Sequence, residues 1–220
     1  MDIADRVEHA LLYPASTADQ VRQAVMAASK HHLAAVTVPP VWARFAVTAA
    51  VPSPVRVCVT VGYPMGTHTA SAKGLEARLA LEEGAAEVTI VPNLAAFKSG
   101  YREAFRQDVA YVVKQCRLAG PDALVKALLY IDLLGPEELN EAVRAIQASG
   151  VRFVLFGSYG AQPLPLAAVR LGLDSTEPGS RAGVMGEIRT WEEAQPLLDL
   201  GLARLVTPWG VDLVLEAEKR

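Results

Sequence analysis

The chain has 220 residues, of which 51% are hydrophobic and 20% are charged, and its formal net charge is -3. This length and balance fit a single globular domain that buries a substantial core. Because the chain has no basic excess, we expect it to bind neither nucleic acid nor an anionic membrane surface.

Two features of the sequence bear on where the protein works. The N-terminal segment carries acidic residues and lacks the apolar run of a signal peptide, and no stretch approaches the ~18 uncharged apolar residues of a membrane helix. Cys58 and Cys116 lie in apolar runs, where a cysteine is usually a small buried hydrophobe rather than half of a disulfide. We therefore expect a cytoplasmic protein.

Apolar, strand-like runs alternate with amphipathic, helix-like segments along the chain. The expected strands are Val7–Leu12, Leu33–Val38, Val55–Val61, Glu87–Val91, Ala123–Ile131, Val151–Phe156, Ala182–Met185 and Ala203–Val206. Three helices are expected at Trp42–Ala50, Arg102–Leu118 and Leu166–Leu171. Four others are expected after Thr17, around Leu75 and Leu79, from Gly135 and after Thr190. A last helix is expected at the end of the chain.

Local signals mark several helix ends. Thr17 has Gln20 three residues later, and Thr190 has Glu193 at the same spacing, which is the pattern of a capping box. Gly84 follows the helix that contains Leu75 and Leu79, and it is expected to end that helix as a C-cap glycine.

About eight strand–helix units in this length predict a parallel sheet closed into a (β/α)8 TIM barrel, of the α/β class, as one domain over residues 1–220. A doubly wound open sheet is the alternative. No G-x-G-x-x-G pattern follows any expected strand, so the sequence predicts no dinucleotide cofactor.

In such a barrel the site is built from the C-terminal ends of the strands and the loops that follow them. The polar residues that we expect there, as candidates for ligand binding, are Glu8, His9, Thr37, Thr89, Tyr130, Ser158, Gly186, Glu187 and Thr207. The sixth strand contributes little to this set, because its stretch VRFVLFGSYG has no Lys, His, Asp, Glu or Cys after Arg152.

The candidate set has no clear catalytic group. Lys126 is the one lysine inside an expected strand, and a Schiff-base lysine needs a depressed pKa. Its early position in the strand favours a structural lysine that is paired with a carboxylate. A nucleophilic role for Lys126 is the alternative.

Metal and phosphate sites are also not expected. Glu8, His9 and His68 could approach one another across two strands, yet no short motif such as H-E-x-x-H supports a metal site. Glu187 would repel a phosphate after the seventh strand, and Pro208 lacks an N–H donor after the eighth. We therefore predict no metal and no cofactor.

Five segments along nearly the whole chain resemble the 2-deoxyribose-5-phosphate aldolase family. They are VEHALLYPAST, VGYPMGTHTASAKGLEA, EEGAAEVTIVPNLAAFKSG, LVKALLYIDLL and GEIRTWEEAQPLLDLGLARLVT. The resemblance implies a TIM barrel, a class I aldolase reaction and a homo-oligomer such as a dimer.

The resemblance also implies three catalytic positions, and this chain departs from the family at each of them. In the family a lysine on strand six forms the Schiff base, a lysine on strand seven lowers the pKa of the first, and an aspartate on strand four moves protons. The matching positions hold Leu155, Gly183 and Thr89. Leucine cannot form an iminium, and no Lys or Arg lies between Arg152 and Arg170 to replace the missing lysine.

Other positions of the family pattern have changed as well. The strand-five lysine is retained as Lys126, but the glutamate four residues later is Tyr130. A glycine after strand seven is replaced by Glu187, and the residues on either side of the strand-eight threonine are Val206 and Pro208. The segment AQPLPLAAV replaces a longer, glycine-rich segment after strand six.

Three hypotheses follow from these residues. The first is a non-catalytic homologue, a pseudoenzyme, that binds a partner or an uncharged or cationic small ligand at the barrel mouth. The second is an active aldolase-type lyase that uses Lys126 as a relocated nucleophile. The third is another reaction in which Glu8, His9 or Glu187 acts as acid or base.

Overall fold

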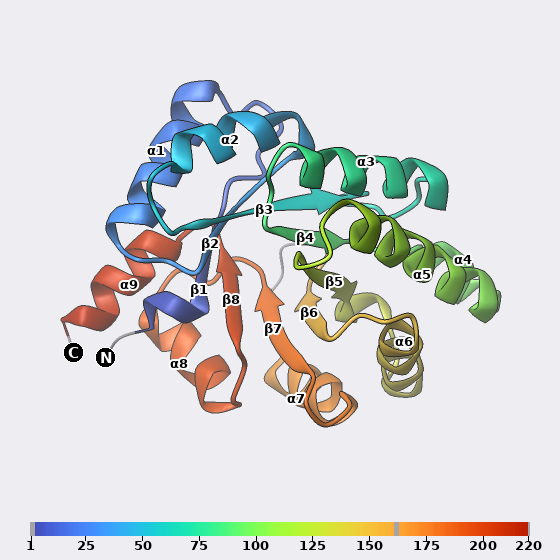
Figure 1. The fold of residues 1–220 in the computed structure, drawn as a ribbon. Helices are drawn as coiled ribbons and strands as arrows, with labels where there is room; N and C mark the ends of the chain where they lie inside the picture. Colours follow the sequence, from blue (N-terminus) through green and yellow to red (C-terminus); the bar gives the residue numbers. More distant parts are fainter. Residues whose placement is uncertain (1–2, 161–162, 220) are drawn as a thin grey trace.

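The computed structural model describes residues 3–160 and 163–219. Eight parallel strands pair in chain order, each with the next and the last with the first, and close a barrel (Figure 1). The (β/α)8 TIM barrel is therefore confirmed, and the open-sheet alternative is wrong. The expected domain limits, residues 1 and 220, and the first two residues of AQPLPLAAV lie outside the described residues.

The strands lie close to the runs expected from hydrophobicity. They are β1 (Val7–Ala10), β2 (Ala35–Val38), β3 (Arg56–Val61), β4 (Glu87–Ile90), β5 (Leu124–Tyr130), β6 (Phe153–Gly157), β7 (Arg181–Met185) and β8 (Arg204–Thr207). Their ends differ from the expected ones by one or two residues, because apolar residues also continue into the turns that flank a strand.

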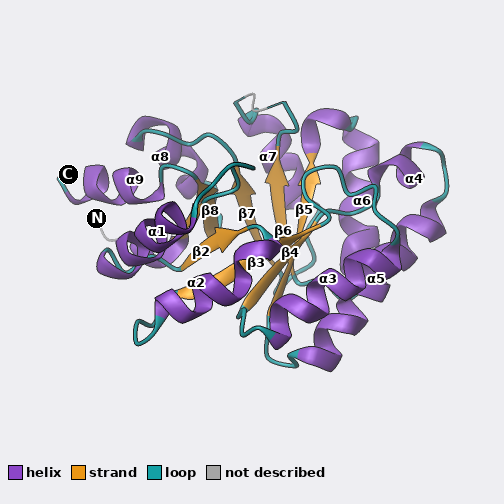
Figure 2. Ribbon diagram, turned by 90° about the horizontal axis from the view of Figure 1, so that it is seen from above, coloured by secondary structure: helices purple, strands orange, loops and turns teal. Residues whose placement is uncertain are grey.

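The helices surround the barrel, as the view from above shows (Figure 2). They are α1 (Ala18–Lys30), α2 (Ala43–Ala50), α3 (Ala70–Glu82), α4 (Leu94–Lys98), α5 (Arg102–Ala119), α6 (Pro136–Ala148), α7 (Leu166–Asp174), α8 (Trp191–Asp199) and α9 (Gly210–Glu218). Among the described residues, none of these helices has the length and hydropathy to cross a membrane.

The expected helix-end signals are confirmed. Thr17 and Gln20 form a capping box at the start of α1, and Thr190 and Glu193 form another at α8. Gly84 follows α3 with φ of +98°, a backbone conformation that glycine adopts without steric cost. The short α4 was not expected, because one turn of helix is too short to show a hydrophobic period.

Strand register decides which side chains point into the barrel. Successive side chains alternate between the two faces of a strand, and Glu8, Val206 and Met185 follow one another across the pairings of β1, β8 and β7. One face of every strand packs against the helices in the main core. On the other face, residues at β1 and at β4 to β8 form a separate group of buried apolar side chains inside the barrel. The inside of the barrel is therefore packed, as is usual for this fold.

Gly183 of β7 lies at a crowded position inside the barrel. A Cβ at this position would lie 2.6 Å from the carbonyl oxygen of Arg204 and 2.9 Å from Cδ2 of Leu155. Leu155 is completely buried and pairs with Gly183 across β6 and β7. The Leu155 side chain thus uses the space that a side chain at position 183 would need.

This crowding predicts a stability effect that can be measured. We expect Gly183→Ala to lower the free energy of unfolding by about 1–3 kcal/mol, because backbone or buried side chains must move to admit the methyl group. Gly186→Ala is the matched control, since a Cβ there would meet its nearest atom only at 3.7 Å. Urea unfolding measures both variants, and equal stabilities would contradict the packing described above.

Candidate functional site

Polar side chains inside the barrel gather in two places that an apolar layer separates. Nearer the N-terminal ends of the strands lies a group that we call the lumen charge cluster. It consists of Glu8, Glu87, Lys126 and Arg204. Nearer the C-terminal ends lies an open pocket, which we call the mouth pocket.

The lumen charge cluster pairs two carboxylates with two cations at short range. Lys126 Nζ lies 2.5 Å from Glu8 Oε2 and 2.7 Å from Glu87 Oε2. Arg204 Nη1 lies 2.8 Å from the same oxygen of Glu8 and 3.6 Å from Glu87 Oε2. The side chains of Glu8, Glu87 and Lys126 have no exposed surface. Their charges are compensated by one another rather than by water.

Neighbouring groups add to the cluster without closing every hydrogen bond. The hydroxyl of Thr37 donates to Glu8 Oε1. Arg56 Nε lies 3.0 Å from Glu87 Oε1, yet this oxygen has no hydrogen bond to a described residue, so Arg56 contributes charge attraction only. Arg204 Nε is likewise buried without a hydrogen-bond partner in the described part of the chain.

The cluster holds Glu8 and Lys126 in their charged forms. Burial by itself raises the pKa of Glu8, but the charges of Lys126 and Arg204 outweigh burial and lower this pKa to about 2. Burial lowers the pKa of Lys126, but the surrounding groups, which include Glu8 and Glu87, reverse this effect and raise the pKa above its ordinary value. Lys126 is therefore an ammonium ion at neutral pH.

Glu8, Cys58 and Glu87 form a buried group whose ligand atoms lie within 4.8 Å of one another. The group does not suit a metal ion, because both carboxylates already contact Lys126 and Arg204. Burial raises the pKa of the Cys58 thiol to about 12, which opposes the thiolate form that binds metals. Cys58 instead shares a hydrogen bond of 3.3 Å with Thr89.

An apolar layer covers the lumen charge cluster on the side of the mouth. Its members are buried inward-facing side chains: Ala10, Val91, Leu128, Leu155, Met185 and Val206. Ala10, Leu128, Met185 and Val206 also line the mouth pocket and form its floor. A molecule in the pocket therefore meets hydrocarbon and a thioether rather than the ion pairs underneath.

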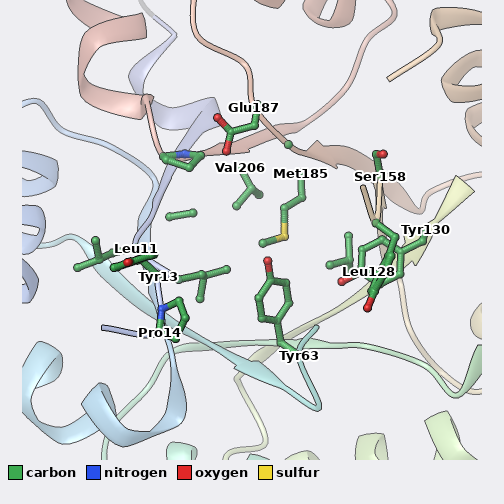
Figure 3. Close-up of a pocket in the computed structure, with 15 residues that line it drawn as sticks. Leu11, Tyr13, Pro14, Tyr63, Leu128, Tyr130, Ser158, Met185, Glu187 and Val206 are labelled. Atoms are coloured by element: carbon green, nitrogen blue, oxygen red, sulfur yellow. The ribbon is translucent and has the colours of Figure 1, made fainter. Parts of the chain in front are cut away.

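The mouth pocket has a volume of about 390 Å³. Figure 3 shows Tyr63 and Met185 pointing toward one another in the middle, with Tyr130 and Ser158 on one side and Glu187 at the rim. Tyr159 from the loop after β6 also lines the pocket, and its ring packs edge-on against Tyr130 at 5.4 Å between centroids. Of the described residues that line this pocket, none is Lys, Arg or His.

Hydrogen bonds hold the tyrosines in place. The hydroxyl of Tyr130 donates to the carbonyl of Pro64 at 2.7 Å, which ties the end of β5 to the loop after β3. Asp132 accepts hydrogen bonds from the hydroxyl of Ser158 and the backbone N–H of Tyr159, both at 3.1 Å. The aromatic wall is thus fixed by contacts between neighbouring strand ends.

A second buried ion pair fixes the loop that carries Tyr63. Lys73 of α3 pairs with Asp108 of α5 at 2.6 Å and donates to the backbone carbonyls of Gly66 and Val91. Gly66 has φ of +69°, and a Cβ there would lie 2.3 Å from the carbonyl oxygen of Pro92. The loop can therefore pass this close to the end of β4 only with glycine at that position.

The structure divides the polar residues predicted for the mouth into three groups. Tyr130, Ser158, Gly186 and Glu187 line the mouth pocket. Glu8, Thr37 and Thr89 lie below the apolar layer, in or beside the lumen charge cluster. His9 and Thr207 lie on the outer face of their strands.

The outward position of His9 follows from its contacts. A Cβ on Gly210, the first residue of α9, would lie 3.3 Å from Cβ of His9. Burial lowers the pKa of His9, and Asp212 of α9 opposes that shift only in part. Thr207 donates its hydroxyl hydrogen bond to the carbonyl of Ile188, which joins the loops after β7 and β8. Glu8 lies in the lumen, His9 packs against α9 and His68 is exposed, so the structure does not bring these three residues together.

Sequence reasoning missed the importance of Glu87, Arg204 and Met185. Glu87 and Arg204 each begin a strand, where a charged residue is usually solvated. The signal that could have found them is alternation, since both share the inward face with Thr89 and Val206 two residues later. Met185 was expected only as the end of a strand.

Comparisons of the sequence with curated proteins find relatives of the same length. A deoxyribose-phosphate aldolase of Thermosynechococcus vestitus is 35% identical over 97% of this chain and 96% of its own. The deoxyribose-phosphate aldolase of Streptococcus mutans is 32% identical, with the same coverage of the two chains. No protein-family model matches the chain.

Solved structures give the same picture. An aldolase called QR15 has a TM-score of 0.92 and 28% identity, over 100% of this chain and 97% of its own. A tetrameric deoxyribose phosphate aldolase from Aeropyrum pernix has a TM-score of 0.88 and 26% identity, over 98% of this chain and 91% of its own.

The lumen charge cluster predicts a strong dependence of stability on Lys126. We expect Lys126→Met to lower the free energy of unfolding by about 3–5 kcal/mol, because two buried carboxylates lose their shared cation. Lys98→Met is the control, since Lys98 pairs with Glu138 at the surface and should cost less than about 1 kcal/mol. Denaturant unfolding measures both variants, and similar losses would contradict the assigned role.

The cluster also predicts how stability depends on acid. The pKa of Glu8 in the folded chain, about 2, lies below its ordinary value of 4.5, so its contribution is present above about pH 4.5 and is lost as the pH falls toward 2. We expect the free energy of unfolding to fall less steeply over this window in Glu8→Gln than in the wild type. The free energy of unfolding is measured by urea titration at several pH values. An equal dependence of this free energy on pH in the wild type and in Glu8→Gln would contradict the assignment.

Proposed function

The chain belongs to the deoxyribose-phosphate aldolase family, and we propose that it binds a small ligand at the barrel mouth without the Schiff-base reaction of that family. The resemblance read from its segments is thereby confirmed as family membership. The proposal concerns the finer point, which is the chemistry that this chain's own side chains support.

One observation carries the proposal: Leu155 and Gly183 pack against each other where the family pattern places two lysines. Leu155 is fully buried, and its Cδ2 would lie 2.9 Å from any Cβ at position 183. Leucine has no nitrogen to attack a carbonyl, and glycine provides no cation to lower the pKa of a neighbouring amine. Thr89, at the third family position, is hydrogen-bonded to Cys58 rather than aimed at the pocket.

The contacts of Lys126 do not support the alternative hypothesis that this residue acts as a relocated nucleophile. Its amine contacts two carboxylates, is completely buried and has a raised pKa, whereas an amine that forms an iminium must lose its proton. The apolar layer that includes Leu128 and Leu155 lies between this amine and the mouth pocket. Lys126 is best understood as the structural centre of the lumen.

A different acid–base reaction has little support from the same geometry. The pKa of about 2 keeps Glu8 ionised, and this residue does not line the mouth pocket. His9 packs against α9 on the outside of the barrel. Glu187 does line the pocket, but acid–base catalysis also needs a second proton-transfer group in reach of the same substrate atom.

The ligand that we propose is uncharged or cationic. The residues that line the mouth pocket include Glu187 but no basic side chain, and Arg189, which lies beside the pocket, is already paired with Glu187. Pro208 gives no N–H where a phosphate would need one. The ligand contacts are assigned to Tyr130, Ser158, Gly186 and Glu187. Assembly into a homo-oligomer is proposed as well, supported by the tetrameric relative from Aeropyrum pernix; the cytoplasmic location stays a prediction.

Retro-aldol turnover of deoxyribose 5-phosphate tests the proposal directly. We expect no acetaldehyde release above background at high protein concentration, because no amine with a lowered pKa faces the pocket. An active family aldolase is the positive control, and Lys126→Met is the matched variant for residual activity. Turnover at rates typical of enzymes would contradict the proposal.

Borohydride trapping with an aldehyde substrate tests the Lys126 alternative separately. We expect no covalent adduct on the intact protein by mass spectrometry. An adduct that maps to Lys126 and disappears in Lys126→Met would establish the relocated nucleophile.

A further inference from the structure

The walls of the mouth pocket combine aromatic rings with one carboxylate. Tyr63, Tyr130 and Tyr159 come from the ends of β3, β5 and β6, and all three line the same cavity. Glu187 enters from the loop after β7, and in Figure 3 it lies at the top of the pocket, with Tyr63 below and Tyr130 to the right. The face of an aromatic ring carries partial negative charge, so rings and carboxylate favour the same sign of ligand.

Burial and neighbouring groups act on two of these tyrosines, Tyr63 and Tyr130. Burial raises the pKa of Tyr63, and the charge of Glu187 raises it further. Burial likewise raises the pKa of Tyr130, and Tyr63, Tyr159 and Asp132 add to the shift. Tyr63 and Tyr130 therefore remain neutral phenols at physiological pH, and the carboxylate among the described lining residues is that of Glu187.

Beside the pocket, Glu187 and Trp209 already contact a cation of this chain, Arg189. Arg189 Nη2 lies 3.1 Å from Glu187 Oε2, and its guanidinium carbon lies 5.3 Å from the centre of the Trp209 ring. Trp209 also donates its indole N–H to Glu187 at 3.2 Å. Because the side chain of Arg189 is 60% exposed, this pair is screened by water and contributes little energy, so a ligand can share the carboxylate.

We propose that the mouth pocket selects an organic cation: a substituted ammonium group with a small apolar body. The ammonium group lies among the rings of Tyr63, Tyr130 and Tyr159 and is attracted by Glu187, as cations are held over aromatic faces elsewhere. The apolar body rests on Leu128, Met185 and Val206 at the floor. This inference rests on the proposed function, because it names the ligand class of the same pocket.

The size and composition of the pocket agree with such a ligand. A cavity of about 390 Å³ is near the lower end of the range for small-molecule sites. An anionic sugar phosphate would meet the carboxylate of Glu187 and a set of rings, with no basic side chain among the lining residues described. A neutral sugar would leave most of its hydroxyls against the apolar floor, where few partners are available.

A matched pair of probes separates charge from shape. Choline and 3,3-dimethyl-1-butanol have the same branched end, but only choline carries the positive charge. We expect choline to bind at least about 5-fold more tightly, as measured by NMR chemical-shift titration of the full chain. Equal affinity for the two probes, or binding of neither, would overturn the assignment of a cation.

Two variants locate the binding. Glu187→Gln should weaken choline about 3- to 10-fold and leave the neutral probe unchanged. Tyr159→Leu keeps an apolar side chain but removes a ring, so it should also weaken choline selectively. Glu193→Gln, on the neighbouring helix α8, is the control for a general loss of negative charge and should not change choline affinity. Unchanged choline affinity in both pocket variants would contradict the assigned site.

Deoxyribose 5-phosphate serves as the third probe and keeps the two proposals distinguishable. If it is cleaved, the proposed function fails, whatever the result with choline. If it is not cleaved and the neutral probe binds as well as choline, only the assignment of a cationic ligand fails.

Discussion

The packing of this barrel depends on charges that are compensated inside its lumen. Lys126 stands between Glu8 and Glu87, and Arg204 reaches the same carboxylates from β8. Isolated charges in such a place would be very unfavourable, so each of the four side chains requires the others. The cluster links β1, β4, β5 and β8, so it holds strands from different sides of the barrel together. In the intact cluster two negative charges balance two positive ones. Removing one member leaves a buried charge without its partner and therefore destabilises the fold.

The lumen charge cluster also affects which side chains can act at the mouth pocket. The only lumen lysine among the described residues is bound by two carboxylates, and its raised pKa holds the amine in the protonated form. The positions above it are filled by hydrocarbon, with Leu155 occupying the space beside Gly183. The C-terminal end of the barrel, where catalysis occurs in this architecture, is left with tyrosines, a methionine and Glu187. A fold can host many functions, and we propose that this mouth serves recognition rather than covalent catalysis.

The pocket keeps its shape through contacts that lie outside it. Lys73 and Asp108 hold the loop after β3 from behind, and the Tyr130 hydroxyl ties that loop to β5. Asp132 holds the backbone of Tyr159 in place by a hydrogen bond from its N–H. A ligand therefore finds a wall that is largely formed before binding, which lowers the entropy lost on association.

The sequence by itself determined the barrel architecture and showed that the sixth strand carries no basic residue after Arg152. Alternating apolar runs, the capping boxes at Thr17 and Thr190, and the lack of a basic group after Arg152 in β6 were all readable without coordinates. Only the tertiary structure decided which polar residues meet. Glu8 and His9 are neighbours in the chain, yet one enters the lumen and the other packs on α9. Lys126 meets a carboxylate 118 residues away. The physical reason is that strand register and barrel closure select neighbours across the sheet, and no local pattern encodes that register.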